Sequence, residues 1–87
     1  NTQVVDYQDK IECKVYPNPN SGQFRMVFSE VPENGKIEFY NTLGQLIKAG
    51  SIENSSETFD LKPHTGMIFY TVLSENKIVL RGKMIVK

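Results

Sequence analysis

The stretch QFRMVFS, residues 23–29, decides the class of fold, because its apolar and polar side chains alternate. In a β-strand, successive side chains point to opposite faces of the sheet. The two phenylalanines and the methionine of this stretch therefore share one face. Its polar side chains take the other, with Val27 as the exception. This pattern predicts a strand with one buried and one solvated face.

The same alternation recurs on both sides of this stretch, in residues 11–15, 36–41, 59–61 and 77–87. In the last of these segments the even positions are apolar apart from one glycine. The sequence predicts that they face the core: Ile78, Leu80, Gly82, Met84 and Val86. The odd positions, which carry four of the segment's basic side chains, are predicted to face outward: Lys77, Val79, Arg81, Lys83, Ile85 and Lys87.

Residues 67–73 are apolar on both faces, which is typical of a central strand covered on both sides. A buried helical segment is the alternative, but Gly66 and the β-branched and aromatic content favour a strand. Residues 42–50 contain apolar positions at helical spacing, yet Gly44 and Gly50 enclose too short a stretch for a stable helix. A turn at residues 42–44 and then a strand through Leu46 is predicted instead.

Turn signals separate these runs. Residues 17–22 contain two prolines and end on Gly22. Residues 32–35 end on Asn-Gly, a hairpin signal, and residues 74–77 are suited to closing the last hairpin. Short alternating strands divided by regular turn signals predict an all-β fold, an Ig-like antiparallel β-sandwich of about seven strands.

The length of 87 residues is that of a single small domain. A chain of this size buries only about 60–65% of its surface, which leaves little room for a deep pocket. Residues 1–10 are mixed and polar, so we interpret them as a linker to an upstream cargo domain and residues 11–87 as the folded domain. The chain opens on Asn1 without a signal-peptide pattern, which favours a fragment or processed tail of a longer protein.

Composition excludes several classes of function. Ten basic residues balance ten acidic ones, so the surplus of positive charge typical of nucleic-acid binders and anionic-membrane binders is absent. The longest run without a charged residue, Pro63–Ser74, is too short to span a bilayer, which takes about 20 apolar residues. We therefore predict neither nucleic-acid binding nor membrane insertion.

Catalytic and metal-binding patterns are weak. Cys13 is the only cysteine and His64 the only histidine, which excludes an internal disulfide and a multi-Cys zinc site. An enzyme would need these two residues paired as nucleophile and base, but a buried cysteine and a solvated loop histidine are the favoured interpretation. The carboxylates are scattered, no phosphate-binding glycine loop occurs, and a single loop calcium site remains the alternative. We expect no cofactor, and folding that needs neither metal nor disulfide.

Three pieces of sequence together resemble a known family: VYPNPNSGQF at residues 15–24, IEFYNTLGQL at 37–46 and GKMIVK at 82–87. They are similar to the type A C-terminal sorting domain of the type IX (Por) secretion system, over about residues 13–87. The matching positions are Tyr16, Pro17, Asn18, Pro19, Gly22, Phe24, Gly44, Gly66 and Gly82. One departure is Ile68: at this position, two residues after Gly66, the family usually has a tyrosine.

The resemblance implies a sorting signal that is itself a folded domain. Such domains follow a cargo that has reached the periplasm, and outer-membrane export machinery reads them so that the cargo is secreted or placed on the cell surface. A sortase-like peptidase then usually removes the domain. By the same resemblance, the residues read by the machinery are Lys83, Met84, Ile85, Val86 and Lys87. An accessory module that binds carbohydrate or protein for a secreted enzyme is the alternative function.

Overall fold

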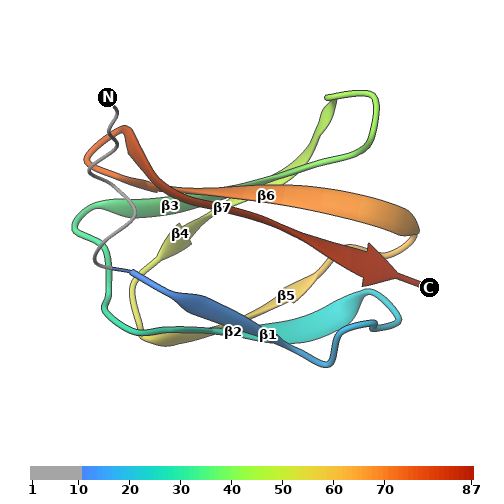
Figure 1. The fold of residues 1–87 in the computed structure, drawn as a ribbon, viewed down its shortest axis with the longest axis horizontal. Coiled ribbons are helices and arrows are strands. Elements are labelled where there is room, and N and C mark those ends of the chain that lie inside the picture. The colour runs from blue at the N-terminus through green and yellow to red at the C-terminus, as the bar shows by residue number, and fades with distance from the viewer. Residues whose placement is uncertain (1–10) are drawn as a thin grey trace, which may run out of the picture.

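The computed structural model describes residues 11–87 and confirms the predicted fold class. These residues form seven strands and no helix (Figure 1). The strands are β1 (Cys13–Tyr16), β2 (Gln23–Phe28), β3 (Gly35–Tyr40), β4 (Leu46–Ile52), β5 (Ser56–Asp60), β6 (Gly66–Ser74) and β7 (Lys77–Val86). The prediction of a linker at residues 1–10 lies outside the described residues.

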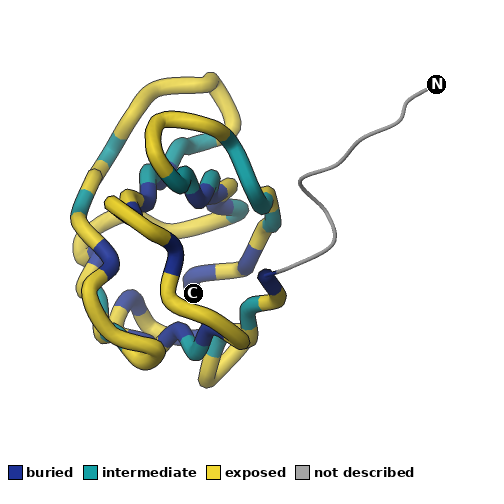
Figure 2. The backbone as a smooth tube through the Cα atoms, turned by 90° about the vertical axis from the view of Figure 1, so that its left-hand side faces the viewer, coloured by how far each residue is buried: buried dark blue, intermediate teal, exposed yellow. Residues whose placement is uncertain are grey.

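The strands pair into two antiparallel sheets that form two layers in Figure 1. The three-stranded sheet has the order β1-β2-β5, and the four-stranded sheet has the order β4-β3-β6-β7. This is the order of an Ig-like sandwich in which the fourth strand joins the sheet of the third, sixth and seventh. Alternation of buried and exposed positions along the strands is visible in Figure 2.

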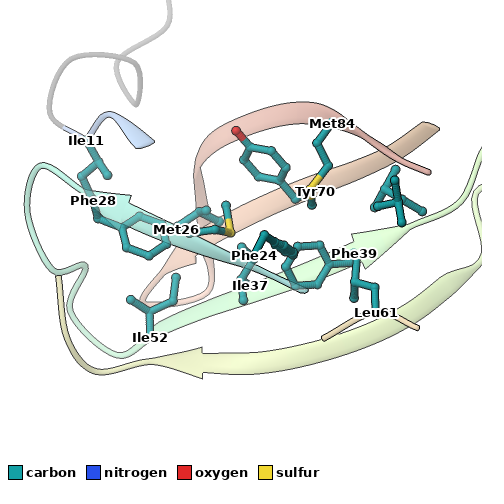
Figure 3. Close-up of a cluster of buried hydrophobic side chains, with 13 residues drawn as sticks. Ile11, Phe24, Met26, Phe28, Ile37, Phe39, Ile52, Leu61, Tyr70 and Met84 are labelled. Atoms are coloured by element: carbon teal, nitrogen blue, oxygen red, sulfur yellow. The ribbon is translucent and has the colours of Figure 1, made fainter. Parts of the chain in front are cut away.

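The core lies between the sheets and is built from the side chains that the alternation assigned to the inner face (Figure 3). Phe24, Met26 and Phe28 of β2 meet Ile37 and Phe39 of β3 there. Burying each such side chain contributes roughly 1.5–3 kcal/mol. At one side of the core the rings of Phe24, Phe39 and Phe59 pack with centroids 5.3–5.9 Å apart.

Two turn predictions are confirmed. Residues 42–44 form the turn before β4, and Asn41 closes it by accepting hydrogen bonds from the amides of Leu43 (2.9 Å) and Gln45 (3.0 Å). The β6–β7 hairpin turns at Glu75 and Asn76, which have φ of 52° and 67°. Two successive residues with positive φ are the mark of a type I′ turn, whose twist matches that of the flanking strands.

The hairpin predicted at residues 32–35 is wrong. This segment joins β2 of the three-stranded sheet to β3 of the four-stranded sheet, so its flanking strands do not pair. Gly35 is needed there for space, because a Cβ atom on it would lie 2.6 Å from Pro32 Cγ and 3.1 Å from Ile52 Cβ. The Asn-Gly pair thus permits a close approach between segments rather than a two-residue hairpin.

β6 is a central strand, as predicted, but the expected cover on both of its sides is wrong. Ile68, Tyr70 and Val72 are buried, and Ile68 at the departure from the family pattern takes an inward position with 1% exposure. On the outer face Phe69 is 41% exposed. Within residues 11–87 nothing packs over it, because both layers of the sandwich meet on the opposite face.

The inward face of β7 is confirmed at its C-terminal end and wrong at its start. A β-bulge shifts the register, so that Leu80 pairs with Val72 but Ile78 pairs with Leu73. Val79 therefore packs against the core, and Ile78 lies beside Leu73 on the outer face. A bulge reverses the facing of the residues beyond it, which an uninterrupted period of two does not anticipate.

Candidate functional site

The two most specific pieces of the sequence lie side by side in the structure. We call residues 17–22 the proline loop and residues 82–87 the terminal segment; both lie at the same end of the sandwich in Figure 1. Asn20 and Val86 form a parallel bridge. The backbone amide of Asn20 donates a hydrogen bond to the backbone carbonyl of Ile85 (3.2 Å), and the backbone amide of Lys87 donates to the backbone carbonyl of Asn20 (2.7 Å). The Asn18 side chain adds a third bond by accepting from the Ile85 amide (3.3 Å).

The Asn20 side chain organises the proline loop. Asn20 is 5% exposed and is the buried polar residue of residues 11–87, whose other buried side chains form the apolar core. Its Nδ2 donates to the Pro17 carbonyl (3.0 Å) and contacts Met84 Sδ (3.8 Å), while its Oδ1 accepts from the Gly22 amide (2.9 Å). A buried amide with its donors and acceptor paired fixes the geometry around it.

Asn20 is also the residue that sequence reasoning missed. It lies inside the quoted motif, but was not among the candidate site residues. An Asn two positions before a Gly is the signature of a turn closed by its own side chain, and that signal was present. What the sequence does not show is that the same residue also reaches the far end of the chain.

The remaining motif positions have structural roles. Gly22 has φ of 113°, and a Cβ there would lie 2.7 Å from Lys62 Cγ, so both conformation and space favour glycine. Phe24 is in the core, whereas Tyr16 is 49% exposed at the end of β1. The other motif residues shape the proline loop, end the turn before β4 or begin β6: Pro17, Asn18, Pro19, Gly44 and Gly66.

The terminal segment presents its side chains in alternation. Met84 and Val86 are each 2% exposed and belong to the core. Lys83, Ile85 and Lys87 are exposed, Ile85 by 38% of its surface. The five residues expected to carry recognition thus divide into two that anchor the segment and three that are accessible.

Gly82 makes room for an aromatic ring. It pairs with Tyr70 across β6 and β7, and a Cβ on it would lie 2.3 Å from both the Tyr70 Cζ and hydroxyl oxygen. The Tyr70 ring therefore covers the glycine backbone, and the residue before Lys83 has no space for a side chain.

Gly82→Ala is expected to lower the melting temperature, because the added methyl group would be forced against the buried Tyr70 ring. Overpacking of this kind costs about 1–3 kcal/mol, and each kcal/mol shifts the midpoint by roughly 4–8 °C in a domain of this size. Gly50→Ala is the matched control: that strand glycine would place its Cβ 3.5 Å from the Phe59 ring, an ordinary contact. Thermal melting of both variants measures the difference. Equal midpoints would contradict a steric requirement at Gly82.

Cys13 and His64 do not form a catalytic pair. Cys13 pairs with Phe28 at the C-terminal end of β2. His64 lies three residues after Leu61, whose backbone amide donates a hydrogen bond to the Gly22 carbonyl, next to the N-terminal end of β2. Burial raises the pKa of the Cys13 thiol to about 11, an effect that its hydrogen bond with Tyr70 offsets in part. Burial likewise raises the pKa of Tyr70 to about 12. The thiol therefore stays protonated at neutral pH, which is the opposite of an activated nucleophile.

Two further features were sought in residues 11–87. No group of three or more His, Cys, Asp and Glu side chains in this part of the chain is arranged to hold a metal ion. Nor does it contain a helix long and apolar enough to cross a bilayer.

Comparison with protein families gives one match of high coverage. The model of a family described as "Secretion system C-terminal sorting domain" matches residues 14–87. A search of curated proteins found no match. The matched range takes in both the proline loop and the terminal segment.

Proposed function

The chain belongs to the family of secretion system C-terminal sorting domains, and on that premise we propose that the export machinery reads the outward side chains of its terminal segment. The accessible residues are Lys83, Ile85 and Lys87. Met84 and Val86 anchor the segment in the core, so that the other three are held at fixed spacing.

Membership of the family establishes the general role. The domain is the C-terminal sorting signal for type IX secretion, it interacts with the machinery of that system, and the protein that carries it is exported to the cell surface or secreted. The family is one of sorting signals rather than catalysts.

The observation that carries the proposal is the pairing of the terminal segment with the proline loop. Its hydrogen bonds to Asn18 and Asn20 lie on the edge of β7 opposite β6, which itself pairs with β7 as far as Val86. Binding costs free energy when it orders flexible groups, about 0.5–1.5 kcal/mol for each long side chain that becomes fixed. A segment whose backbone is already held on both sides loses little further conformational freedom when it binds. The terminal segment is therefore a preorganised ligand.

Other steps of the proposal rest on family membership and, for the linker at residues 1–10, on their mixed and polar composition. The cargo upstream of this domain passes through the periplasm before export. Residues 1–10 form the linker to that cargo and residues 11–87 the sorting domain. A sortase-like peptidase removes the domain after export, and the cargo remains on the surface or is released.

Replacing both Lys83 and Lys87 by Ala should lower export of a fused reporter on the order of tenfold, roughly 1.4 kcal/mol of recognition. The fold should persist, since exposed substitutions usually change stability by less than about 0.5 kcal/mol. The matched control replaces Lys14 and Arg25 by Ala, which removes two exposed positive charges from the three-stranded sheet. The readouts are reporter export from a host with this secretion system and thermal melting. Export equal to that of the parent domain would place recognition elsewhere.

A further inference from the structure

The outer face of the four-stranded sheet carries a row of mainly apolar residues that ends on Lys83. Leu46 of β4 pairs with Tyr40 of β3, Tyr40 pairs with Phe69 of β6, and Phe69 pairs with Lys83 of β7. Cross-strand partners lie about 5 Å apart, so these residues are neighbours on one face across all four strands. Leu46 is 54% exposed and Phe69 41% exposed.

A second pair extends this row along the terminal segment. Ile85, also exposed, pairs with Met67 of β6, directly beside the pair of Phe69 with Lys83. We call these six residues the outer row: Tyr40, Leu46, Met67, Phe69, Lys83 and Ile85. On the other side of the row lies a groove of about 500 Å³, lined among others by Thr71, Leu73, Ile78 and Arg81.

The charge beside the row is positive where β7 borders it. The charged side chains that β7 directs outward, Arg81 and Lys83, are both basic. Glu38 of β3 is the acidic neighbour, and its carboxylate accepts a hydrogen bond from the Tyr40 hydroxyl (2.5 Å). A partner that covers the row therefore gains by placing carboxylates opposite the β7 side.

We infer that the outer row is a docking surface for an export-machinery protein that presents an apolar ridge bordered by carboxylates. This inference rests on the proposed reading of the terminal segment and adds β6, β3 and β4 to the recognised surface. Size supports it, because a stable interface buries about 800 Å² per partner, a patch roughly 28 Å across. Neighbouring strands are only about 4.8 Å apart. A partner that reaches Lys83 and Ile85 on this scale also covers Phe69 and Met67.

The first test measures reporter export with substitutions in the row. Phe69→Thr and Leu46→Thr each introduce threonine, a residue that is compatible with a strand, and remove exposed apolar surface. Each should lower export at least fivefold with a melting temperature within a few degrees of the parent. Val31→Thr is the matched control, since Val31 is 44% exposed in the connection between β2 and β3 and lies outside the row. Leu46, on the edge strand β4, decides the outcome should Phe69→Thr alter the fold.

The second test identifies the occupant. A photoreactive benzoylphenylalanine placed at Phe69 should crosslink, in cells that export the reporter, to a protein of the export machinery identified by mass spectrometry. The same group at Val31 should not give that product. Arg81→Glu should reduce the yield of this crosslink several-fold, whereas Arg81→Lys, which keeps the positive charge, should leave the yield near that of the parent domain.

Three results would overturn the inference: normal export of Phe69→Thr and Leu46→Thr, crosslinks only to a second copy of the chain or to its own cargo, or crosslinks only to lipid. The lysine variants separate this inference from the proposed reading of the terminal segment. If Lys83→Ala and Lys87→Ala export normally while Phe69→Thr does not, the apolar part of the docking surface stands, and the proposed reading of the lysines, with Lys83 as part of the row, is wrong. The reverse pattern retains the lysines and removes the docking surface.

Discussion

Met84→Asp unfolds the domain, whereas Ile85→Asp at the next position leaves it folded. Met84 is 2% exposed between the sheets, so its replacement removes a buried side chain at a cost of about 2–5 kcal/mol. It also places an unpaired carboxyl group in the core, which costs several kcal/mol more. A domain of this size has a net stability on the order of 5 kcal/mol, so the sum exceeds what holds it together.

Ile85→Asp is the matched control because it adds the same charge one residue away, on the outer face where water reaches it. Circular dichroism and thermal melting distinguish the two. The expected result is no cooperative transition for Met84→Asp and a near-normal midpoint for Ile85→Asp. A folded Met84→Asp with a normal midpoint would show that the terminal segment is not part of the core in solution.

Asn20→Ala lowers the melting temperature by about 10–25 °C, the second largest effect expected. The substitution leaves the Gly22 amide and the Pro17 carbonyl without their side-chain partner. The Gly22 amide is in a buried bond, and leaving such a group unpaired costs about 1–3 kcal/mol; the Pro17 carbonyl, which is part-buried, adds less. Each kcal/mol shifts the midpoint by roughly 4–8 °C. A loosened proline loop also holds the terminal segment less firmly, so the backbone amides of Ile85 and Lys87 should exchange hydrogen faster.

Asn41→Ala provides the control for this prediction. Asn41 makes three comparable hydrogen bonds in its turn, to the amides of Leu43 and Gln45 and to the Gln45 side chain (2.8 Å), but water has access to them. Its loss should shift the midpoint far less and leave exchange at Ile85 and Lys87 unchanged. Equal effects of the two substitutions would mean that burial of Asn20 adds nothing to its hydrogen bonds.

Local patterns in the sequence were sufficient for the class of fold and most of its elements. Period-two alternation identified the inner residues of β2, β3 and the end of β7, because burial of one sheet face imposes that period. The turns before β4 and between β6 and β7 were equally readable, since each depends on the conformation of a few adjacent residues. The anchoring of Met84 and Val86, and with it the accessible set of Lys83, Ile85 and Lys87, followed from the same alternation.

Tertiary structure alone decided which segments meet. Asn34-Gly35 joins two sheets instead of closing a hairpin, and the bulge at Val79 turns Ile78 outward, because pairing partners are chosen across the whole fold. The apolar residues on the outer side of β6 were predicted to be buried. Within residues 11–87 the three-stranded sheet packs only against the inner face of β6, which leaves Phe69 exposed. Asn20 reaches Ile85 and Lys87 for the same reason: the sandwich brings the start of β2 to the end of β7, a proximity that no local pattern encodes.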